Sequence, residues 1–309
     1  MLDQRSIYVY RLGAALLFAL ALRCQAQAFG SAVPADSANL GGLTTPIEVK
    51  FADGRLLQGS GFFYLELAPE TEKKEGPHWT AISHVYLVTA KHLIQPKRLK
   101  DIVSFSYALR VGDGDHVAWH RLELDSKELG KRLHICANEV VDVAVVDIYD
   151  QFNSETMKLI GERAQLLSFS AASADKFPGA SPIEVQPGDD VIVIGYPLGI
   201  YDVFNKLPIF KTGLLNTPIG MRFNGMDAFL FDFRYYEGSS GSLIISRPTH
   251  VGFSKEGVLE ESKSREYVFL GVYQGEYYLN DIVPLRADLG LGWYYYNVVE
   301  AIKNPPFAH

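Results

Sequence analysis

Short apolar runs separated by turn residues dominate the chain, and they fall into two series. Residues 47–51 alternate apolar and polar side chains, and Asp53-Gly54 follows directly. That pair is typical of a tight hairpin turn, because glycine tolerates the positive φ that the turn needs. Alternation with a period of two, bounded by turns, predicts β-strands. The predicted strands cover 47–51, 56–64, 85–89, 102–107, 117–124 and 140–148, then 191–194, 209–214, 229–233, 243–245 and 267–273.

Two segments have helical spacing instead. Residues 154–167 predict a helix in the connection between the two series, and 294–303 predict a C-terminal helix that Pro305-Pro306 ends. Many short strands with few helices favour two antiparallel barrels or sandwiches over an alternating β/α fold. We expect the charged stretches 70–75 and 255–266 to be exposed hairpin loops.

The N-terminus has the pattern of a cleaved export signal. Arg5 and Arg11 precede an apolar run over residues 12–22, and Ala26-Gln27-Ala28 follows. The run is too short to cross a bilayer, which takes about 20 residues as a helix. A buried N-terminal helix is the alternative. Cys24 follows Arg23 rather than a small residue, which does not fit a lipoprotein signal.

This pattern divides the chain into a signal peptide over 1–28, a flexible lead-in over 29–45 and a folded domain over 46–309. The domain divides further, at the helical connection, into three parts. They are a first half over about 46–150, a connection over about 151–185, and a second half with the C-terminal helix over about 186–309. We expect no membrane span after signal cleavage, and a location in the periplasm or the medium.

The amino-acid composition excludes some classes of protein. The 309 residues include 48% apolar and 21% charged side chains, which excludes disorder, and the formal net charge is −7 without a long basic run. Nucleic acid binding is therefore not expected. After signal cleavage Cys136 would be the only thiol, so no internal disulfide can form.

Three weak local signals become informative together. His92 follows an apolar strand, Asp142 opens another, and Ser240 lies in a Gly/Ser turn before a third. A serine hydroxyl needs a neighbouring base for nucleophilic attack, and imidazole suits that role. A carboxylate orients the imidazole, and backbone amides of a glycine-rich turn can stabilise the oxyanion. The three residues can meet all of these requirements.

These motifs resemble those of trypsin/chymotrypsin-like serine peptidases, most closely the bacterial trypsin-like domains. Residues 89–92 match T-A-x-H, 142–145 match D-x-A followed by an apolar residue, and 238–241 match G-x-S-G, in the family's order. Residues 59–63 resemble the strand before the histidine, and 195–199 resemble a G-[YF]-P-x-G turn of the bacterial branch. The resemblance implies two antiparallel six-stranded β-barrels, with the active site between them.

The resemblance also implies roles for individual residues. His92 would be the general base, Asp142 its orienting carboxylate and Ser240 the nucleophile, with the amides of Gly238 and Ser240 as the oxyanion hole. Residues 270–275 resemble the strand that pairs with an extended substrate. The predicted substrate contacts in that strand are Tyr273, Gln274 and Gly275.

Two departures from the family pattern affect these expectations. Ser242-Leu243 stands where the family often has Gly-Pro, and Ser239 stands where members activated by cleavage carry Asp. Activation of that kind is therefore not expected. Arg234 lies six residues before Ser240, near the position that floors the primary pocket in trypsin-like enzymes. It could favour acidic substrates, or equally face solvent or pair with Asp232.

The sequence thus predicts an exported serine endopeptidase that acts on polypeptides through an acyl-enzyme and requires no cofactor or metal. The alternative is a catalytically silent relative that binds peptides or an envelope partner. An α/β-hydrolase is excluded because its triad follows the order Ser, Asp, His. His116 and His120 lie in a strand-like stretch, so their spacing does not predict a metal site.

Overall fold

The computed structural model describes residues 40–67, 82–113, 116–162, 165–167, 171–181, 183–254, 257–278 and 286–307. The predicted signal peptide, most of the lead-in and the charged stretch 70–75 lie outside these residues. Strand β1 begins at Thr44, inside the predicted lead-in, and Leu43 just before it is fully buried. The folded domain therefore starts slightly earlier than predicted.

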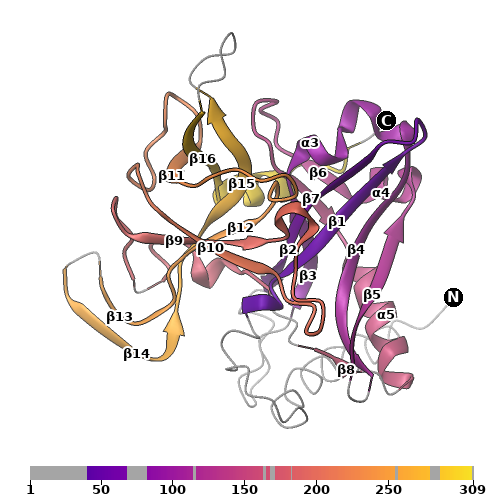
Figure 1. Cartoon of the computed structure of the whole chain (residues 1–309), viewed down its shortest axis with the longest axis horizontal. Helices are drawn as coiled ribbons and strands as arrows, with labels where there is room; N and C mark the ends of the chain where they lie inside the picture. The colour runs from indigo at the N-terminus through magenta and orange to yellow at the C-terminus, as the bar shows by residue number, and fades with distance from the viewer. Residues whose placement is uncertain are drawn as a thin grey trace, which may run out of the picture.

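The first series of strands forms one antiparallel sheet in the order β5-β4-β1-β2-β3-β7-β6, with β8 beside β4 (Figure 1). It has eight strands among the described residues, rather than the predicted six, because two very short strands extend it. Such strands are too short to show an alternating pattern in the sequence. The strands are β1 (Thr44–Phe51), β2 (Leu56–Leu67), β3 (Ile82–Thr89), β4 (Ile102–Asp113), β5 (His116–Leu124), β6 (Leu133–Ile135), β7 (Ala144–Asp147) and β8 (Gln165–Leu166).

The second series forms a six-stranded antiparallel sheet in the order β10-β9-β12-β15-β16-β11. Its two edge strands meet, because Leu215, after β10, bridges to Phe231 in β11, and the Asn216 amide donates to the Leu230 carbonyl at 2.9 Å. The sheet therefore curves back on itself. Its strands are β9 (Asp190–Gly195), β10 (Ile209–Leu214), β11 (Ala228–Asp232), β12 (Leu243–Ser246), β15 (Phe269–Tyr278) and β16 (Arg286–Tyr294).

The helical and hairpin predictions need adjustment at their boundaries. The connecting helix begins at Tyr149 instead of 154, and the C-terminal helix begins at Tyr296 because Tyr294 still pairs with Gly271. Of the charged stretch 255–266, residues 259–266 form a mostly exposed strand that pairs with the preceding strand as a hairpin. The remaining elements are α3 (Lys91–Ile94), α4 (Ser126–Arg132), α5 (Tyr149–Gly161), α6 (Tyr296–Lys303), β13 (Thr249–Phe253), β14 (Leu259–Glu266), and the 3₁₀ turns η3 (Pro96–Asp101), η4 (Ala174–Lys176) and η5 (Pro197–Gly199).

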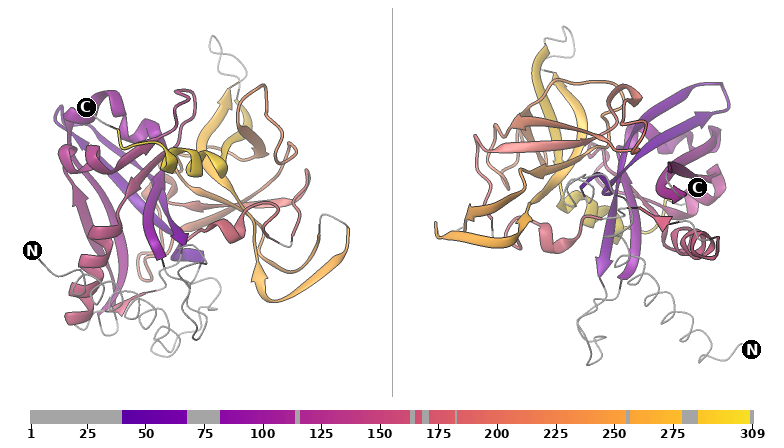
Figure 2. Two further views of the ribbon diagram at one scale, coloured as in Figure 1. Left: turned by 180° about the vertical axis from the view of Figure 1, so that it is seen from behind. Right: turned by 60° about the horizontal axis from the view of Figure 1, so that its bottom comes forward.

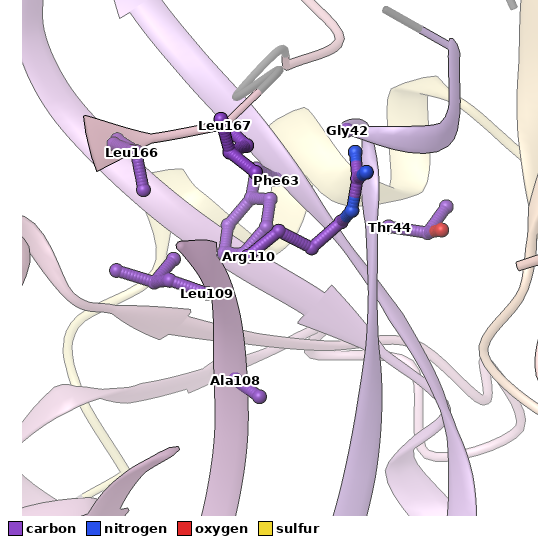
Figure 3. A pocket seen from close by; sticks show the side chains of 8 residues that line it. All are labelled: Gly42, Thr44, Phe63, Ala108, Leu109, Arg110, Leu166 and Leu167. Atoms are coloured by element: carbon purple, nitrogen blue, oxygen red, sulfur yellow. The ribbon is translucent and has the colours of Figure 1, made fainter. Parts of the chain in front are cut away.

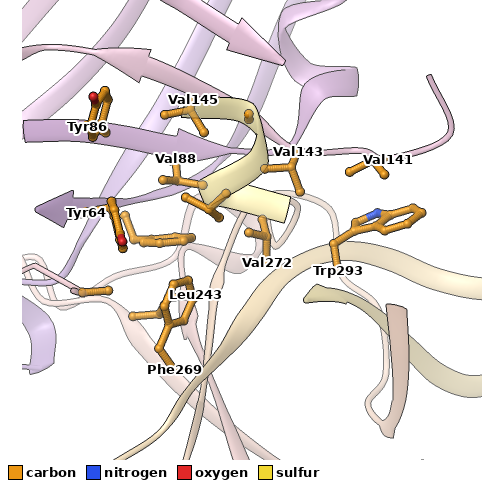
Figure 4. Close-up of a cluster of buried hydrophobic side chains, with 14 of the residues drawn as sticks. Tyr64, Tyr86, Val88, Val141, Val143, Val145, Leu243, Phe269, Val272 and Trp293 are labelled. Atoms are coloured by element: carbon orange, nitrogen blue, oxygen red, sulfur yellow. The ribbon is translucent and has the colours of Figure 1, made fainter. Parts of the chain in front are cut away.

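The strands that lie where the two halves of the protein pack together are buried on both faces. In β7, the side chains of Ala144 and Val146 enter the core of the first half, whereas Val145 enters a core shared by the two halves. Leu243 and Phe269 reach the same shared core from the second half (Figure 4). Two-sided burial explains why these strands read as continuous apolar runs in the sequence.

The C-terminal helix joins the two halves. Helix α6 follows β16 of the second sheet and contacts β6 and β7 of the first (Figure 2). The Cys136 thiol donates to the Asn297 carbonyl at 3.1 Å, and the Asn304 side chain donates to the Ile135 carbonyl at 2.9 Å. The prediction of an all-β chain of two halves with a C-terminal helix is confirmed. None of the helices in the described ranges has the length and apolar character needed to span a membrane.

Candidate active site

His92 and Asp142 are held together by two hydrogen bonds. His92 lies in the short helix α3, directly after β3, and Asp142 precedes β7, which pairs with β3. One oxygen of the carboxylate, Oδ1, accepts from the His92 amide at 2.7 Å, and Oδ2 lies 2.6 Å from Nδ1 of the ring. Asp142 is buried, whereas the His92 side chain is 47% exposed. Since Nδ1 is engaged, Nε2 is the nitrogen available for proton exchange.

The turn that carries Ser240 packs against the segment before His92. Gly241 has a φ of +82°, and a Cβ there would lie 2.2 Å from the Ser60 carbonyl oxygen and 2.9 Å from the Ala90 amide nitrogen. Only glycine permits both this conformation and this approach. Ala90 is two residues from His92, so the fold brings the serine turn of the second half to the histidine segment of the first.

Ser60 in β2 ties this turn to its surroundings. It is fully buried, and its hydroxyl donates to the Gly238 carbonyl and accepts from the Tyr196 amide, both at 2.8 Å. Its own amide donates to the Ser240 carbonyl at 2.8 Å, and its carbonyl accepts from the Thr89 hydroxyl at 2.7 Å. Sequence reasoning missed this role, because a serine in an apolar strand carries no sign of partners so distant in the chain.

The amides of Gly238 and Ser240 are available for a ligand. Within the described chain neither donates a hydrogen bond, whereas the amides of Ser239 and Gly241 donate to Tyr236 and Tyr273. Gly238 has a φ of +82°, and a Cβ there would lie 2.6 Å from the Tyr196 carbonyl oxygen. An oxyanion hole made of these two amides stays a prediction.

The Ser240 hydroxyl points to the second half in this structure. It donates to the backbone carbonyl of Gln274 at 3.0 Å, and no hydrogen bond joins it to His92 among the described residues. Nearby, burial raises the pKa of Tyr235, with a smaller contribution from the charge of Glu237, and the Ser240 side chain partly offsets this increase. The structure thus pairs His92 with Asp142 and brings the serine turn beside them, without the serine–histidine bond.

The predicted substrate contacts differ in accessibility. Tyr273 is fully buried, its amide donates to the Ser242 carbonyl, and its carbonyl accepts from the Gly241 amide. Tyr273 therefore supports the serine turn through its backbone, and its predicted contact with substrate stays a prediction. Gln274 and Gly275 are partly exposed and stay candidates.

Arg234 is exposed, and no ion pair joins it to Asp232 in the described part of the chain. Its backbone carbonyl accepts a hydrogen bond from Lys211 Nζ at 3.1 Å. A preference for acidic substrates through Arg234 stays a prediction.

A small cavity of about 10 Å³ lies elsewhere, against β1, β2, β4 and β8. Its lining includes the buried Arg110, whose guanidinium donates to the Asn205 carbonyl (Figure 3). None of the predicted site residues lines it. The described residues contain no cluster of three His, Cys, Asp or Glu side chains that could hold a metal ion.

The chain is similar in sequence to one family of known proteins. The family described as trypsin-like peptidase domain matches residues 55–251, so the chain belongs to that family of proteases. No curated protein matches the chain. Among solved structures, an inactivated protease paralogue of the scabies mite is 13% identical, with a TM-score of 0.45. The protease Anisep from Arthrobacter nicotinovorans is 12% identical, with a TM-score of 0.44. Each match covers 86% of this chain and 96% of the other.

Proposed function

We propose that the protein is a serine endopeptidase that uses Ser240, His92 and Asp142. One observation supports this proposal most strongly. His92 and Asp142 are joined by two hydrogen bonds, and beside them lies a glycine turn with two amides that donate to no other group of the described residues. Membership of the trypsin-like peptidase family implies polypeptide substrates. These features supply a base, its orienting carboxylate and oxyanion donors next to one hydroxyl.

The reaction begins with a rotation of the Ser240 side chain away from Gln274 toward Nε2 of His92. Such a rotation exchanges one staggered rotamer for another and is fast compared with turnover. The bond from Oγ to the acyl carbon then forms while the hydroxyl proton passes to Nε2, and Asp142 stabilises the imidazolium. The same proton goes to the leaving amine as the peptide C–N bond breaks. Water then hydrolyses the acyl-enzyme through the same base.

A fluorophosphonate probe tests this assignment, because it forms a covalent bond only with an activated serine. We expect the purified protein to be labelled and to hydrolyse peptides, and Ser240→Ala to lose both properties while keeping its unfolding temperature. Ser239→Ala is the matched control, since that neighbouring hydroxyl has no hydrogen-bond partner among the described residues. A Ser240→Ala protein that still hydrolyses peptides would disprove the assignment.

A catalytically silent peptide-binding protein is the second candidate. The bond from the Ser240 hydroxyl to Gln274 favours it, because this bond directs the nucleophile away from His92. Such a protein would bind peptides, detected by a change in the fluorescence anisotropy of labelled peptides, without being labelled by the fluorophosphonate. The two experiments together separate the candidates.

We further propose that the protein acts outside the cytoplasm, in the periplasm or the medium. The support is the positively flanked apolar run before Ala28 and the single thiol that would follow it. N-terminal sequencing of secreted material should find a chain that starts near residue 29. An intact Met1 on the exported protein would contradict the proposal.

A further inference from the structure

Leu198 has an unusual backbone conformation beside the serine turn. It lies in η5, in the turn over residues 195–199 that follows β9, with a φ of +55° and a ψ of 22°. This left-handed region is uncommon for residues other than glycine. The Leu198 side chain is 57% exposed, so side-chain packing does not account for the conformation. The backbone contacts of Leu198 are therefore the place to look for its role.

The backbone of this turn packs against Gly238. The Leu198 amide donates to the Glu237 carbonyl at 2.5 Å, and this is the only hydrogen bond to that carbonyl among the described residues. A Cβ on Gly238 would lie 3.1 Å from the Leu198 nitrogen and 3.4 Å from the Gly199 nitrogen. Glu237 and Gly238 share one peptide group, so Leu198 holds the peptide that carries the unused Gly238 N–H.

This hydrogen bond fixes the direction in which the Gly238 amide points. A peptide group is planar, and in its trans form the C=O and N–H bonds point in opposite directions. Rotation of this peptide would move the Gly238 N–H and would also turn the Glu237 oxygen away from Leu198. The next peptide of the turn is held separately, because the Gly238 carbonyl accepts from Ser60. Leu198 is thus the contact that sets the orientation of the Glu237–Gly238 peptide.

We propose that Leu198 is a positioning residue, whose backbone amide keeps the Glu237–Gly238 peptide in the orientation that stabilises the oxyanion. This inference rests on the proposed peptidase function. It gives a role to the turn over 195–199, which the three residues of the triad leave unexplained. A strained backbone conformation persists only where surrounding contacts hold it, and such residues are concentrated at active sites.

Replacing the Leu198 amide with an ester tests the N–H directly. Suppression of a nonsense codon with the α-hydroxy analogue of leucine gives the full chain with an ester oxygen in place of this one N–H. Loss of an oxyanion donor lowers kcat by about 10²–10³. The ester leaves the donor present but free to turn, so we expect kcat for peptides to fall by about tenfold or more at an unchanged KM. The rate of fluorophosphonate labelling should fall with it.

The same replacement at Ile200 is the matched control. The Ile200 amide donates to the Pro197 carbonyl at 2.9 Å within the same turn and does not reach Glu237. An ester at Leu198 weakens this Pro197 carbonyl as an acceptor, and the Ile200 ester removes its hydrogen bond altogether. The Ile200 ester should nevertheless keep the native kcat. A native kcat in the Leu198 ester, or equal decreases in the two esters, would overturn the inference.

Two side-chain variants test the conformation of Leu198. Leu198→Gly permits the positive φ and should keep kcat near the native value. Leu198→Ile places a β-branched side chain in a conformation that tolerates it poorly, so kcat should fall at an unchanged KM. A glycine variant that loses kcat, or an isoleucine variant that keeps it, would contradict the inference. Failure of the proposed function gives a different result, since the native Ser240 would then not react with the fluorophosphonate and no peptide would be cleaved.

Discussion

Replacing Ser60 with alanine should loosen the turn that carries Ser240. The Ser60 hydroxyl donates to Gly238 and accepts from Tyr196, so it links the serine turn to the turn after β9. These are bonds across 178 and 136 positions of the chain, and Ser60 is fully buried. Alanine removes the shared partner of both groups and adds no polar atom in its place.

The expected decrease in stability follows from the two polar groups that lose their hydrogen-bond partner. A buried polar group that loses its hydrogen-bond partner costs about 1–3 kcal/mol, whereas a satisfied bond contributes only about 1 kcal/mol net. The Gly238 carbonyl and the Tyr196 amide have no other partner among the described residues. We therefore expect Ser60→Ala to lower the free energy of unfolding by roughly 3 kcal/mol, which corresponds to about 5–12 °C in Tm.

Urea unfolding followed by circular dichroism measures this loss. Ser83→Ala is the control, since the Ser83 hydroxyl donates to the Glu66 carbonyl in an exposed position and its loss should cost less than about 0.5 kcal/mol. Because Gly238 also carries one of the two amides that we propose as oxyanion donors, the rate of fluorophosphonate labelling should fall in Ser60→Ala as well. A stability loss below about 1 kcal/mol with unchanged labelling would refute the reasoning.

Three further changes test other parts of the structure. Gly241→Ala should lower the free energy of unfolding, measured with urea, far more than Gly54→Ala. Both glycines have a positive φ, but only a Cβ at Gly241 would clash with backbone atoms. Equal decreases in the two variants would contradict this reasoning. Asp142→Asn should lower kcat for peptides by about 10⁴ with little change in Tm. The asparagine side chain has one acceptor oxygen instead of two, so it cannot replace both carboxylate oxygens that face the backbone amide and Nδ1 of His92. A decrease in kcat of less than tenfold would argue against the triad. Burial raises the pKa of Cys136 to about 12, so its thiol should stay protonated at pH 8 and react with iodoacetamide far more slowly in the native than in the urea-unfolded protein. In the unfolded protein the thiol loses its proton at a lower pH than in the native protein. The protonated, buried thiol therefore contributes its full stabilisation below about pH 9, and this stabilisation declines as the pH rises toward 12. Fast alkylation of the native protein at pH 8 would contradict the burial of Cys136.

The sequence predicted those parts of the fold that depend on local pattern. Strand alternation placed most of the longer strands, and glycine in G-x-S-G marked a turn that requires a positive φ at Gly238 and Gly241. Short strands such as β6 were not predicted, because three residues are too few to show an alternation of apolar and polar side chains. The start of α5 was missed as well, since the Asp147 carboxylate that accepts from the Tyr149 amide belongs to the end of a strand.

The candidate site was partly predictable for the same reason. His92, Asp142 and Ser240 stand in recognisable local motifs, and the structure confirms that the first two are bonded to each other. The bonds from Tyr273 to the serine turn were not predicted, because a strand motif does not show which backbone groups are already used by a neighbouring strand or turn.

By itself, the sequence determined the all-β class, the division into two series of strands and the three motifs with their chemistry, because periodicity, turn residues and nucleophile motifs are properties of neighbouring residues. Only the tertiary structure decided that Ser60 supports the serine turn and that the Ser240 hydroxyl is bonded to Gln274. These contacts join residues brought together by the pairing of strands and the packing of two sheets, and no local pattern of side chains encodes which distant group will fill a given space.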